Sequence, residues 1–309
     1  MKKILIAGGA GFLGSNLCKK LIQDNEIICL DNLSSGKLEN IKPFLDKKNF
    51  SFINQDVIQP IDVKIDEIYN LACIASPIQY QKNPIQTLKS SVFGINNLLE
   101  LATKNKAKIL QTSTSEVYGN PLEHPQTETY FGNVNFIGKR SCYDEGKRCA
   151  ETLMTDFNRI YGTKIKIARI FNTYGENMAI DDGRVISNFI VQALKNKDIT
   201  IYGTGSQTRS YCYVEDLIEG LIKLMDSSDE ITFPINLGNS EEHSILETAE
   251  LILSKINTKS KISFKDLPED DPIKRKPDIT LAKKHLNWEP KISFEKGIEK
   301  TIAYFKEII

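Results

Sequence analysis

The sequence predicts an α/β fold in which a doubly wound parallel sheet carries helices on both faces, with a smaller mixed α/β domain toward the C-terminus. Two observations predict it. Short apolar segments alternate with longer amphipathic segments through the first half of the 309 residues, as repeated strand–helix units require. A glycine-rich segment lies between the first apolar segment and the first amphipathic one, where a strand would turn into a helix.

Most of the expected strands lie before residue 171, and one rejoins the sheet late. They are Lys3–Ala7, Glu26–Leu30, Phe50–Asn54, Glu67–Leu71, Lys108–Ser113, Lys164–Ile170 and Pro234–Leu237. The expected helices are Gly11–Gln23, Asn83–Asn105, Tyr143–Tyr161, Ile245–Ile256, Asp278–Leu286 and Phe294–Ile308. We expect residues 1–171 with 209–239 to form the larger domain, and 172–208 with 240–309 the smaller one. Lys265–Pro277, which is charged and contains proline, is the expected mobile loop.

Composition argues against several classes of protein. Forty basic side chains balance forty acidic ones, which is untypical of a general nucleic-acid binder or a polybasic membrane protein. No apolar run approaches the roughly 18 residues of a membrane span. The six cysteines form no Cys-x-x-Cys pair and the three histidines are scattered, so we expect reduced thiols in a cytoplasmic protein and no metal site. The basic and apolar start resembles a signal peptide, but glycines from Gly8 onward interrupt the apolar stretch.

The glycine-rich segment has the spacing G-x2-G-x2-G. Gly8, Gly11 and Gly14 follow the first expected strand, and Phe12 and Leu13 lie between the last two glycines. Side chains at the glycine positions would keep a pyrophosphate away from the backbone N–H groups at the start of the helix. The segment therefore predicts a Rossmann-type dinucleotide site. The alternative is a purely structural turn that binds no nucleotide.

The second expected strand leads into Asp31, seventeen residues after Gly14. A carboxylate there can accept hydrogen bonds from the adenosine ribose and would repel a 2′-phosphate. No arginine follows immediately, so NAD is favoured over NADP. Further cofactor contacts are expected after the second, third and fourth strands, at Asn32, Asp56, Val57, Leu71 and Ala72.

Tyr143 and Lys147 stand four residues apart, which puts a phenol and an ammonium on one face of a helix. Tyrosine titrates near pH ~10, and a nearby lysine cation is expected to lower the pKa of the phenol. The pair can then accept a proton from a substrate alcohol. Tyr-x3-Lys alone is usually ordinary helix surface, so it is the dinucleotide site upstream that favours the catalytic interpretation.

Several longer segments carry a resemblance to a known family. They are Asn70–Pro77, Asn83–Lys89, Ser113–Gly119, Arg140–Arg148, Ala168–Gly175, Asp182–Phe189, Tyr202–Arg209 and Lys276–Ile279. On these segments the chain resembles the extended short-chain dehydrogenase/reductase family over essentially its full length, and within it the UDP-glucuronate decarboxylases (UDP-xylose synthases). The resemblance implies an enzyme with tightly bound NAD that acts on a UDP-sugar, without nucleic-acid or membrane partners. It also implies a homodimer formed through Asn83–Asn105 and Tyr143–Tyr161.

The resemblance implies roles for individual residues. Tyr143 would take the proton of the sugar 4-OH, Lys147 would hold the nicotinamide ribose, and Thr114 would hydrogen-bond the 4-oxygen. Arg184 would help to hold the cofactor. The residues expected to hold the sugar or the nucleotide diphosphate are Lys89, Asn172, Arg209 and Arg275.

The implied reaction is NAD-dependent decarboxylation of UDP-glucuronate to UDP-xylose. Oxidation at C4 would turn the C6 carboxylate into a β-keto acid, which loses CO2 readily. Glu116 would protonate C5 or position the water that does so. In the related 4,6-dehydratases an aspartate stands at the position of Ser115, and in the 4-epimerases the position of Glu116 is usually not acidic. Thr114-Ser115-Glu116 therefore favours decarboxylation.

The chain departs from the family pattern at a few positions. Glu176-Asn177 replaces the usual Pro-Arg, which removes a positive charge near the expected substrate cleft, and Ile74 and Lys139 stand where proline is common. Two alternatives stay open. One is another NAD-dependent nucleotide-sugar enzyme, namely a 4-epimerase, 4,6-dehydratase or C4 oxidase, and the other is a non-catalytic NAD-binding scaffold.

Overall fold

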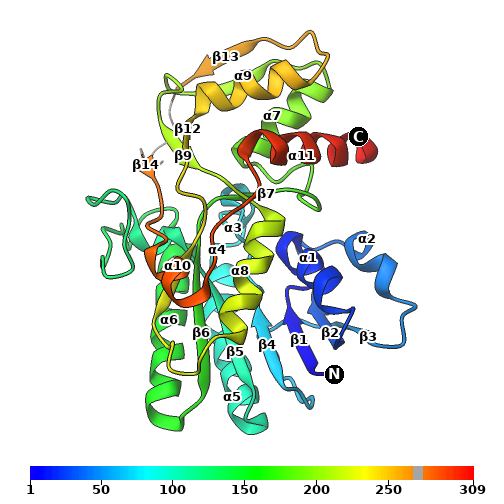
Figure 1. The fold of residues 1–309 in the computed structure, drawn as a ribbon, viewed down its shortest axis with the longest axis vertical. Helices are drawn as coiled ribbons and strands as arrows, with labels where there is room; N and C mark the ends of the chain where they lie inside the picture. The colour runs from blue at the N-terminus through cyan, green and yellow to red at the C-terminus, as the bar shows by residue number, and fades with distance from the viewer. Residues whose placement is uncertain (267–273) are drawn as a thin grey trace.

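A seven-stranded, wholly parallel sheet forms the base of the molecule (Figure 1). The computed structural model describes residues 1–266 and 274–309. The strands, in the order β11-β6-β5-β4-β1-β2-β3, are β1 (Lys3–Ala7), β2 (Glu26–Asp31), β3 (Phe50–Asn54), β4 (Glu67–Asn70), β5 (Lys108–Thr114), β6 (Lys164–Ile170) and β11 (Pro234–Leu237). The predicted doubly wound parallel sheet is confirmed, and so is the late return of Pro234–Leu237.

Helices cover both faces of the sheet, and alternate residues of β1 show why. Ile4 and Ile6 pack in one buried cluster with residues of the α1 and α8 helices, whereas Leu5 and Ala7 pack in a second cluster with α5 and α6. Strands buried on both faces read as continuous apolar runs, which is how the sequence revealed them. The helices are α1 (Phe12–Leu21), α2 (Leu38–Ile41), α3 (Pro77–Tyr80), α4 (Pro84–Lys89), α5 (Ile95–Asn105), α6 (Ser141–Tyr161), α7 (Val185–Leu194), α8 (Val214–Asp226), α9 (Ile245–Lys255), α10 (Thr280–Leu286) and α11 (Phe294–Ile308).

The long helix expected over Asn83–Asn105 is interrupted. A π-helical turn, η2 (Ser90–Gly94), separates α4 from α5. The turn lies between two close contacts: a Cβ on Gly94 would lie 2.6 Å from Val57 Cγ1, and a Cβ on Gly146 of α6 would lie 2.8 Å from Ser91 Cβ. The chain at Val57 and helix α6 therefore both pack closely against this segment, at the place where the helix changes from α-helical to π-helical. Sequence periodicity did not reveal it, because a π turn changes the helical phase by a single residue.

A smaller part with three short sheets lies above the carboxyl ends of the main strands (Figure 1). Its strands are β7 (Thr173–Tyr174) with β10 (Cys212–Tyr213), β9 (Thr208–Ser210) with β12 (Glu242–Ser244) and β14 (Lys274–Arg275), and β8 (Ile199–Tyr202) with β13 (Ile262–Lys265). None of these strands was predicted, because two to four residues carry too little periodicity. Helices α7 and α8 were missed as well. The division into residues 1–171 with 209–239 and 172–208 with 240–309 stays a prediction.

The loop expected over Lys265–Pro277 is described only at its ends. Residues 267–273 lie outside the described residues, and β14 shows that the end of the segment pairs with β9.

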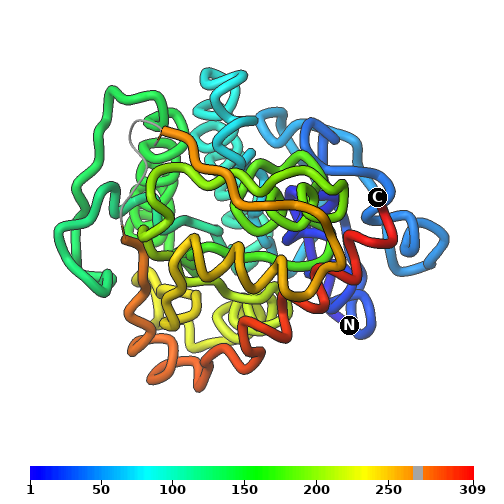
Figure 2. Tube along the Cα trace, turned by 90° about the horizontal axis from the view of Figure 1, so that it is seen from above, coloured from blue at the N-terminus to red at the C-terminus, as the bar shows by residue number. Residues whose placement is uncertain are grey.

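Another long connection, between β5 and α6, extends to the side of the molecule opposite α2 (Figure 2). No helix in residues 1–266 or 274–309 combines the length and the apolar character that a bilayer crossing requires.

The turn after β1 lies at the topological switch of the sheet. β1 pairs with β2 on one side and with β4 on the other, and such a switch opens a crevice at the carboxyl ends of the strands. Backbone packs tightly there: a Cβ on Gly14 would overlap the Gly8 oxygen and lie 2.7 Å from Gly9 Cα. Gly11 is different, because a Cβ there would meet only the Gly8 oxygen, at 3.3 Å.

This contrast gives a prediction about stability. Gly14→Ala should lower the free energy of unfolding by about 3 kcal/mol or more, because the clash is with rigid backbone. Gly11→Ala should change it by less than about 1 kcal/mol, because Gly11 has an ordinary φ of −78° and a Cβ there would meet one atom, the Gly8 oxygen, at 3.3 Å. Chemical denaturation of both variants is the measurement. Equal losses in the two variants would contradict the packing described here.

Candidate active site

The carboxyl edge of the sheet brings together most of the residues expected to hold a cofactor. Gly8 lies directly against the chain after β4, since a Cβ there would lie 2.8 Å from the Leu71 carbonyl and 2.9 Å from Ala72 N. Helix α1 begins at Phe12, and its N-cap residue Gly11 supplies no side-chain cap. The first turn therefore keeps backbone N–H groups for an external anion, and Gly11 places no side chain in the way of a phosphate.

Arg184 closes this turn from the other side. Its guanidinium lies over the Phe12 ring, 5.6 Å from the centroid, and its Nε donates to Asp182 Oδ1 at 2.5 Å. The structure thus brings Arg184 to the glycine turn, although 172 residues separate it from Phe12 in the sequence. Leu13, the next residue of the turn, is half-buried against the cluster that lies under α1.

Asp31 is a buried carboxylate at the end of β2. Its Oδ2 accepts from Ala10 N at 3.0 Å and its Oδ1 from Leu33 N at 2.8 Å. Burial raises the pKa of Asp31, and these two backbone hydrogen bonds oppose that rise. Each carboxylate oxygen can accept more than one hydrogen bond, so ribose hydroxyls can still be bound.

The residues after β2 and β3 meet at the same edge. Asn32 Nδ2 donates to Asp56 Oδ2 at 2.9 Å, and Val57 is buried against Gly94 of η2. Together with the uncapped turn of α1 and the carboxylate of Asp31, this set of donors and acceptors fits NAD. A pyrophosphate would lie on α1, and the adenosine would lie between Asp31 and Asp56.

Tyr143 and Lys147 face the end of β5 from the first turns of α6. Gly146 allows α6 to approach η2 closely, as described above, and both functional side chains are buried. Lys147 Nζ donates to the Thr112 carbonyl at 2.8 Å and lies 5.7 Å from the Tyr143 ring centroid. Tyr143 also stacks on Tyr80, with ring centroids 5.1 Å apart.

The expected lowering of the Tyr143 pKa is not found in this structure. Burial raises the pKa of Tyr143 well above its usual value, and the hydrogen bond with the Thr114 side chain only partly opposes it. Burial also lowers the pKa of Lys147. The lysine charge therefore does not overcome the desolvation of the phenol in the protein alone. An added positive charge beside the phenol would favour the phenolate.

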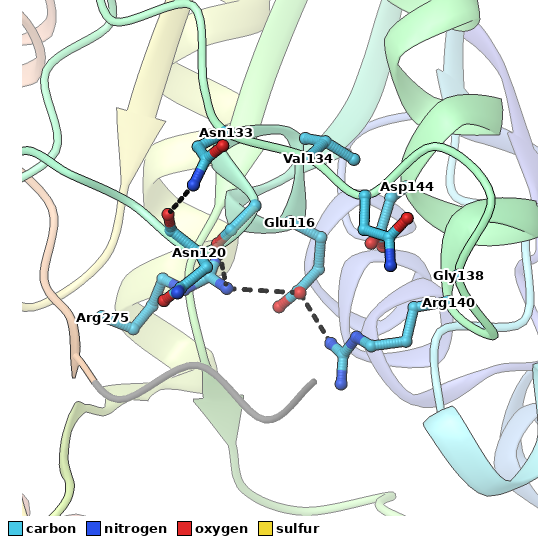
Figure 3. Close-up of a pocket in the computed structure, with 10 residues that line it drawn as sticks. Glu116, Asn120, Asn133, Val134, Gly138, Arg140, Asp144 and Arg275 are labelled. Atoms are coloured by element: carbon cyan, nitrogen blue, oxygen red, sulfur yellow. Dashed lines mark hydrogen bonds and ion pairs between the residues drawn. The ribbon is translucent and has the colours of Figure 1, made fainter. Parts of the chain in front are cut away.

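Thr114, Ser115 and Glu116 form the junction between β5 and a short 3₁₀ turn, η3 (Ser115–Tyr118). Thr114 caps this turn, since its Oγ1 accepts from Glu116 N at 3.2 Å. The Glu116 carboxylate lies between two guanidinium groups, as Figure 3 shows, with Arg140 Nη2 at 2.6 Å and Arg275 Nη2 at 3.3 Å. Ser115 is buried, and its carbonyl accepts from Arg275 Nη1.

These contacts decide the charge of Glu116. Burial alone would raise its pKa, but the charges of Arg275 and Arg140 outweigh burial and hold the pKa of Glu116 below its usual value. Glu116 is therefore a carboxylate at neutral pH. A carboxylate accepts hydrogen bonds and orients a water, but it has no proton of its own to give.

The residues expected to bind substrate are only partly brought together. The register of β14 and β9 sets Arg275 opposite Arg209, and both arginines are buried. Asn172 lies just before β7, where its carbonyl accepts from Cys212 N at 2.9 Å. Lys89 lies on the exposed end of α4 and is not among the residues that line the cavity around Glu116.

That cavity has a volume of about 250 Å³. It is lined by Glu116, Gly119, Asn120, Asn133, Val134, Asn135, Gly138, Arg140, Asp144 and Arg275. Sequence analysis gave no role to Arg140 or Asp144. Both lie close to Tyr143 in the sequence. Charged residues at the start of the helix that carries Tyr143 were the signal from which a role for them could have been predicted. The asparagines of the β5–α6 connection carried no comparable signal.

Glu176 and Asn177, which depart from the family pattern, lie against α1 and not around the cavity. Asn177 Nδ2 donates to Ser15 Oγ at 3.0 Å, and the Glu176 carbonyl accepts from Asn16 Nδ2 at 3.0 Å. The Glu176 carboxylate accepts from Tyr213 Oη at 2.6 Å. Among the residues that the structure describes, no group of three His, Cys, Asp or Glu side chains is placed to hold a metal ion.

The chain is similar to proteins of known activity over nearly its full length. The sequence profile of the GDP-mannose 4,6 dehydratase family matches residues 5–301. UDP-glucuronic acid decarboxylase 1 of Arabidopsis thaliana is 52% identical over 308 residues, which cover 99% of this chain and 70% of that protein. UDP-glucuronic acid decarboxylase 5 of the same plant is 53% identical over 298 residues, with 96% and 87% covered.

A solved structure has the same fold as this chain. The UDP-glucuronic acid 4-epimerase of Bacillus cereus, determined with UDP-glucuronic acid and NAD, matches with a TM-score of 0.90. It is 27% identical, and the match covers 99% of this chain and all of that chain. With its parallel sheet, its glycine turn and its Tyr-x3-Lys helix, the chain therefore belongs to the extended short-chain dehydrogenase/reductase family, in which UDP-glucuronic acid decarboxylases are among its relatives.

Proposed function

We propose that this protein is an NAD-dependent UDP-glucuronate decarboxylase that forms UDP-xylose. The observation that carries the proposal is the similarity to UDP-glucuronic acid decarboxylases at 52% and 53% identity over almost the entire chain. The site supports it, because the Tyr143–Lys147 pair and the Glu116 carboxylate both lie around the end of β5.

The first part of the reaction needs a base at the sugar 4-OH. Tyr143 takes that proton, Thr114 hydrogen-bonds the 4-oxygen, and Lys147 holds the nicotinamide ribose and the Tyr143 phenolate. NAD, when bound, supplies a hydride acceptor at C4 and later returns the hydride, so that no net oxidation occurs. Burial raises the pKa of Tyr143, and a positively charged nicotinamide held beside it would oppose that rise.

The second part is the loss of CO2. Once C4 is a ketone, the C6 carboxylate belongs to a β-keto acid, and the ketone takes up the electrons of the breaking C5–C6 bond as an enolate. Glu116 is ionised, so it orients water at C5 and does not donate its own proton. Ser115 stands where related 4,6-dehydratases have an acidic aspartate, which disfavours loss of a hydroxyl group.

Two arginines, an asparagine and a lysine would hold the substrate. Arg209 and Arg275 would meet the diphosphate, with Asn172 nearby, and Lys89 would approach the sugar. Arg275 already donates to the Ser115 carbonyl and to the Gly119 carbonyl. A part of its role is therefore to hold η3 in place, and its Nε has no hydrogen-bond partner among the described residues.

A second candidate function is 4-epimerisation of the same sugar nucleotide. The similarity to the UDP-glucuronic acid 4-epimerase of B. cereus favours it, since the two proteins share the fold over almost the full chain. An epimerase must preserve the C6 carboxylate, and the two reactions share every step up to the 4-ketone. They differ in the mass of the product.

The quaternary structure and the location in the cell are also proposals. We propose a cytoplasmic homodimer with a UDP-sugar substrate, and a larger NAD-binding domain (1–171 with 209–239) beside a smaller nucleotide-sugar-binding domain (172–208 with 240–309). Exposed apolar side chains on α4 and η2 support the dimer, because Ile85 is 70% exposed and Phe93 is 55% exposed. Such side chains on neighbouring helical turns are typical of a helix–helix interface between subunits.

One prediction of the proposed function concerns the product. Purified protein incubated with UDP-glucuronate should release CO2 and form UDP-xylose, with no lasting absorbance at 340 nm from reduced cofactor. Mass spectrometry of the nucleotide sugar and measurement of CO2 test this. A product of unchanged mass would instead support the epimerase, and lasting absorbance at 340 nm would support a C4 oxidase.

A second prediction concerns Glu116. Glu116→Gln removes the negative charge that orients water at C5 but leaves Tyr143 in place. We expect C4 oxidation to change little and the steps at C5 to slow by about 100-fold, so that a 4-keto sugar nucleotide accumulates. Rapid quenching followed by mass spectrometry measures both steps. Tyr143→Phe is the comparison, because it should abolish oxidation itself, and an equal loss of both steps in Glu116→Gln would contradict the assigned role.

A third prediction concerns the dimer. Replacing Ile85 and Phe93 together by glutamate should shift the protein toward monomer, because charged side chains would be desolvated in the interface. Sedimentation velocity at several concentrations measures this shift. Phe264→Glu is the matched control, since Phe264 is similarly exposed (57%) but lies on β13 in the smaller part. An unchanged sedimentation coefficient for the double variant would refute this interface.

A further inference from the structure

The proposed reaction takes up one proton from solvent in each turnover. The substrate loses its C6 carboxylate as neutral CO2, and C5 gains a hydrogen in its place. The 4-oxygen needs a proton again when C4 is reduced, and Tyr143 can return the one that it took from the 4-OH. A separate proton donor for C5 would leave Tyr143 ready for that step, and this argument rests on the proposed function.

Asp144 lies where such a proton donor would have to lie. It follows Tyr143 directly in the first turn of α6, and it lines the cavity that also contains Glu116 and Arg140. Figure 3 shows it on the wall of the cavity that also carries Arg140. The residue is only 6% exposed, and its buried Oδ1 has no hydrogen-bond partner among the described residues. A buried ionised oxygen without a partner is costly, whereas a protonated carboxyl is tolerated.

The surroundings of Asp144 and Glu116 shift the pKa values of the two carboxyl groups in opposite directions. Burial raises the pKa of Asp144 to about 7, the Glu116 charge adds to the rise, and Arg140 and Arg275 oppose it. The pKa of Glu116 is held low by the same two arginines. Two carboxyl groups with separated pKa values in one cavity are the usual arrangement of an acid and its partner base. The ionisable groups that face Asp144 are Tyr80, Glu116, Arg140, Cys142, Tyr143, Glu145 and Arg275.

We propose that Asp144 holds the proton that reaches C5 after CO2 has left, and passes it through the water that Glu116 orients. The O–H bond of Asp144 breaks, the enolate electron pair forms the new C5–H bond, and the C4 carbonyl is restored. Asp144 is left as a carboxylate near the Arg140 guanidinium. Solvent then reprotonates it, which accounts for the one proton taken up in each turnover.

The choice between Asp144 and Glu116 follows from their contacts. Glu116 accepts hydrogen bonds from two guanidinium groups, so protonating it would first require these ion pairs to be weakened. Asp144 Oδ1 has no such partner. Glu116 thus acts as the fixed anion of the pair, and Asp144 acts as the group that exchanges a proton.

The test uses Asp144→Asn, whose amide has nearly the same shape but no acidic proton. In single turnovers with UDP-glucuronate in D2O, the wild type should place deuterium at C5 with one stereochemistry. In Asp144→Asn, CO2 release should persist while stereospecific protonation at C5 slows by about 100-fold. A UDP-4-keto-pentose with deuterium on both faces of C5 should appear.

The pH dependence of the wild type gives a second readout. A donor must be protonated, so C5 protonation should fall about tenfold for each pH unit above the Asp144 pKa of about 7. This decline should vanish in Asp144→Asn. Asp156→Asn is the matched control on α6, because Asp156 is exposed and pairs with Arg159, and it should behave as the wild type.

The outcomes separate the inference from the proposed function. If the wild type released no CO2, the proposed function would fall and the inference with it. If the wild type released CO2 but Asp144→Asn still protonated C5 at the wild-type rate and on one face, the inference alone would be overturned. If Asp144→Asn did not fold, the pH dependence of the wild type would decide. A rate of C5 protonation that stayed constant between pH 6 and pH 9 would overturn the role of Asp144 as the proton donor.

Discussion

The site depends on one electrostatic constraint, which is the half-buried Glu116 carboxylate held between Arg140 and Arg275. Each partner comes from a different element: Glu116 from η3, Arg140 from the residue before α6, and Arg275 from β14. A carboxylate that is largely removed from water is stable only when it is paired with a positive charge. The arginines around it likewise need a negative charge as a partner. The pairing therefore fixes the end of the central sheet, the start of the catalytic helix and the smaller part relative to one another.

The same constraint separates the tasks of the acidic groups. Because two guanidinium groups keep Glu116 ionised, its negative charge adds to burial in keeping Asp144 protonated. Tyr143 also keeps its proton, since burial raises the pKa of the phenol and the charge of Glu116 adds to that rise. In the proposed reaction, the base at C4 would therefore need a positive charge that arrives with the cofactor, whereas the proposed acid at C5 would be prepared by the protein itself.

The sequence was sufficient for the parts of the fold with long regular patterns. The strands around β1 and the turn Gly8–Gly14 followed from apolar runs and glycine spacing, because close backbone packing leaves few residue choices there. The π turn at Ser90–Gly94 and the pairing of Arg275 with Arg209 could not be predicted. Both depend on which distant segments meet, and a strand of two residues has no pattern of its own.

The roles of single charged residues show the same limit. Glu116 received its expected role from the family resemblance, yet its ionised state follows only from two arginines, one 24 and the other 159 residues further along the chain. Asp144 received no role from the sequence, although it lies in the same cavity as Glu116. Spacing along a helix can place a side chain on a face, but the state of its proton depends on what the rest of the fold packs against that face. A motif therefore predicts which chemistry is possible, and the charges brought in from elsewhere decide which group carries each proton.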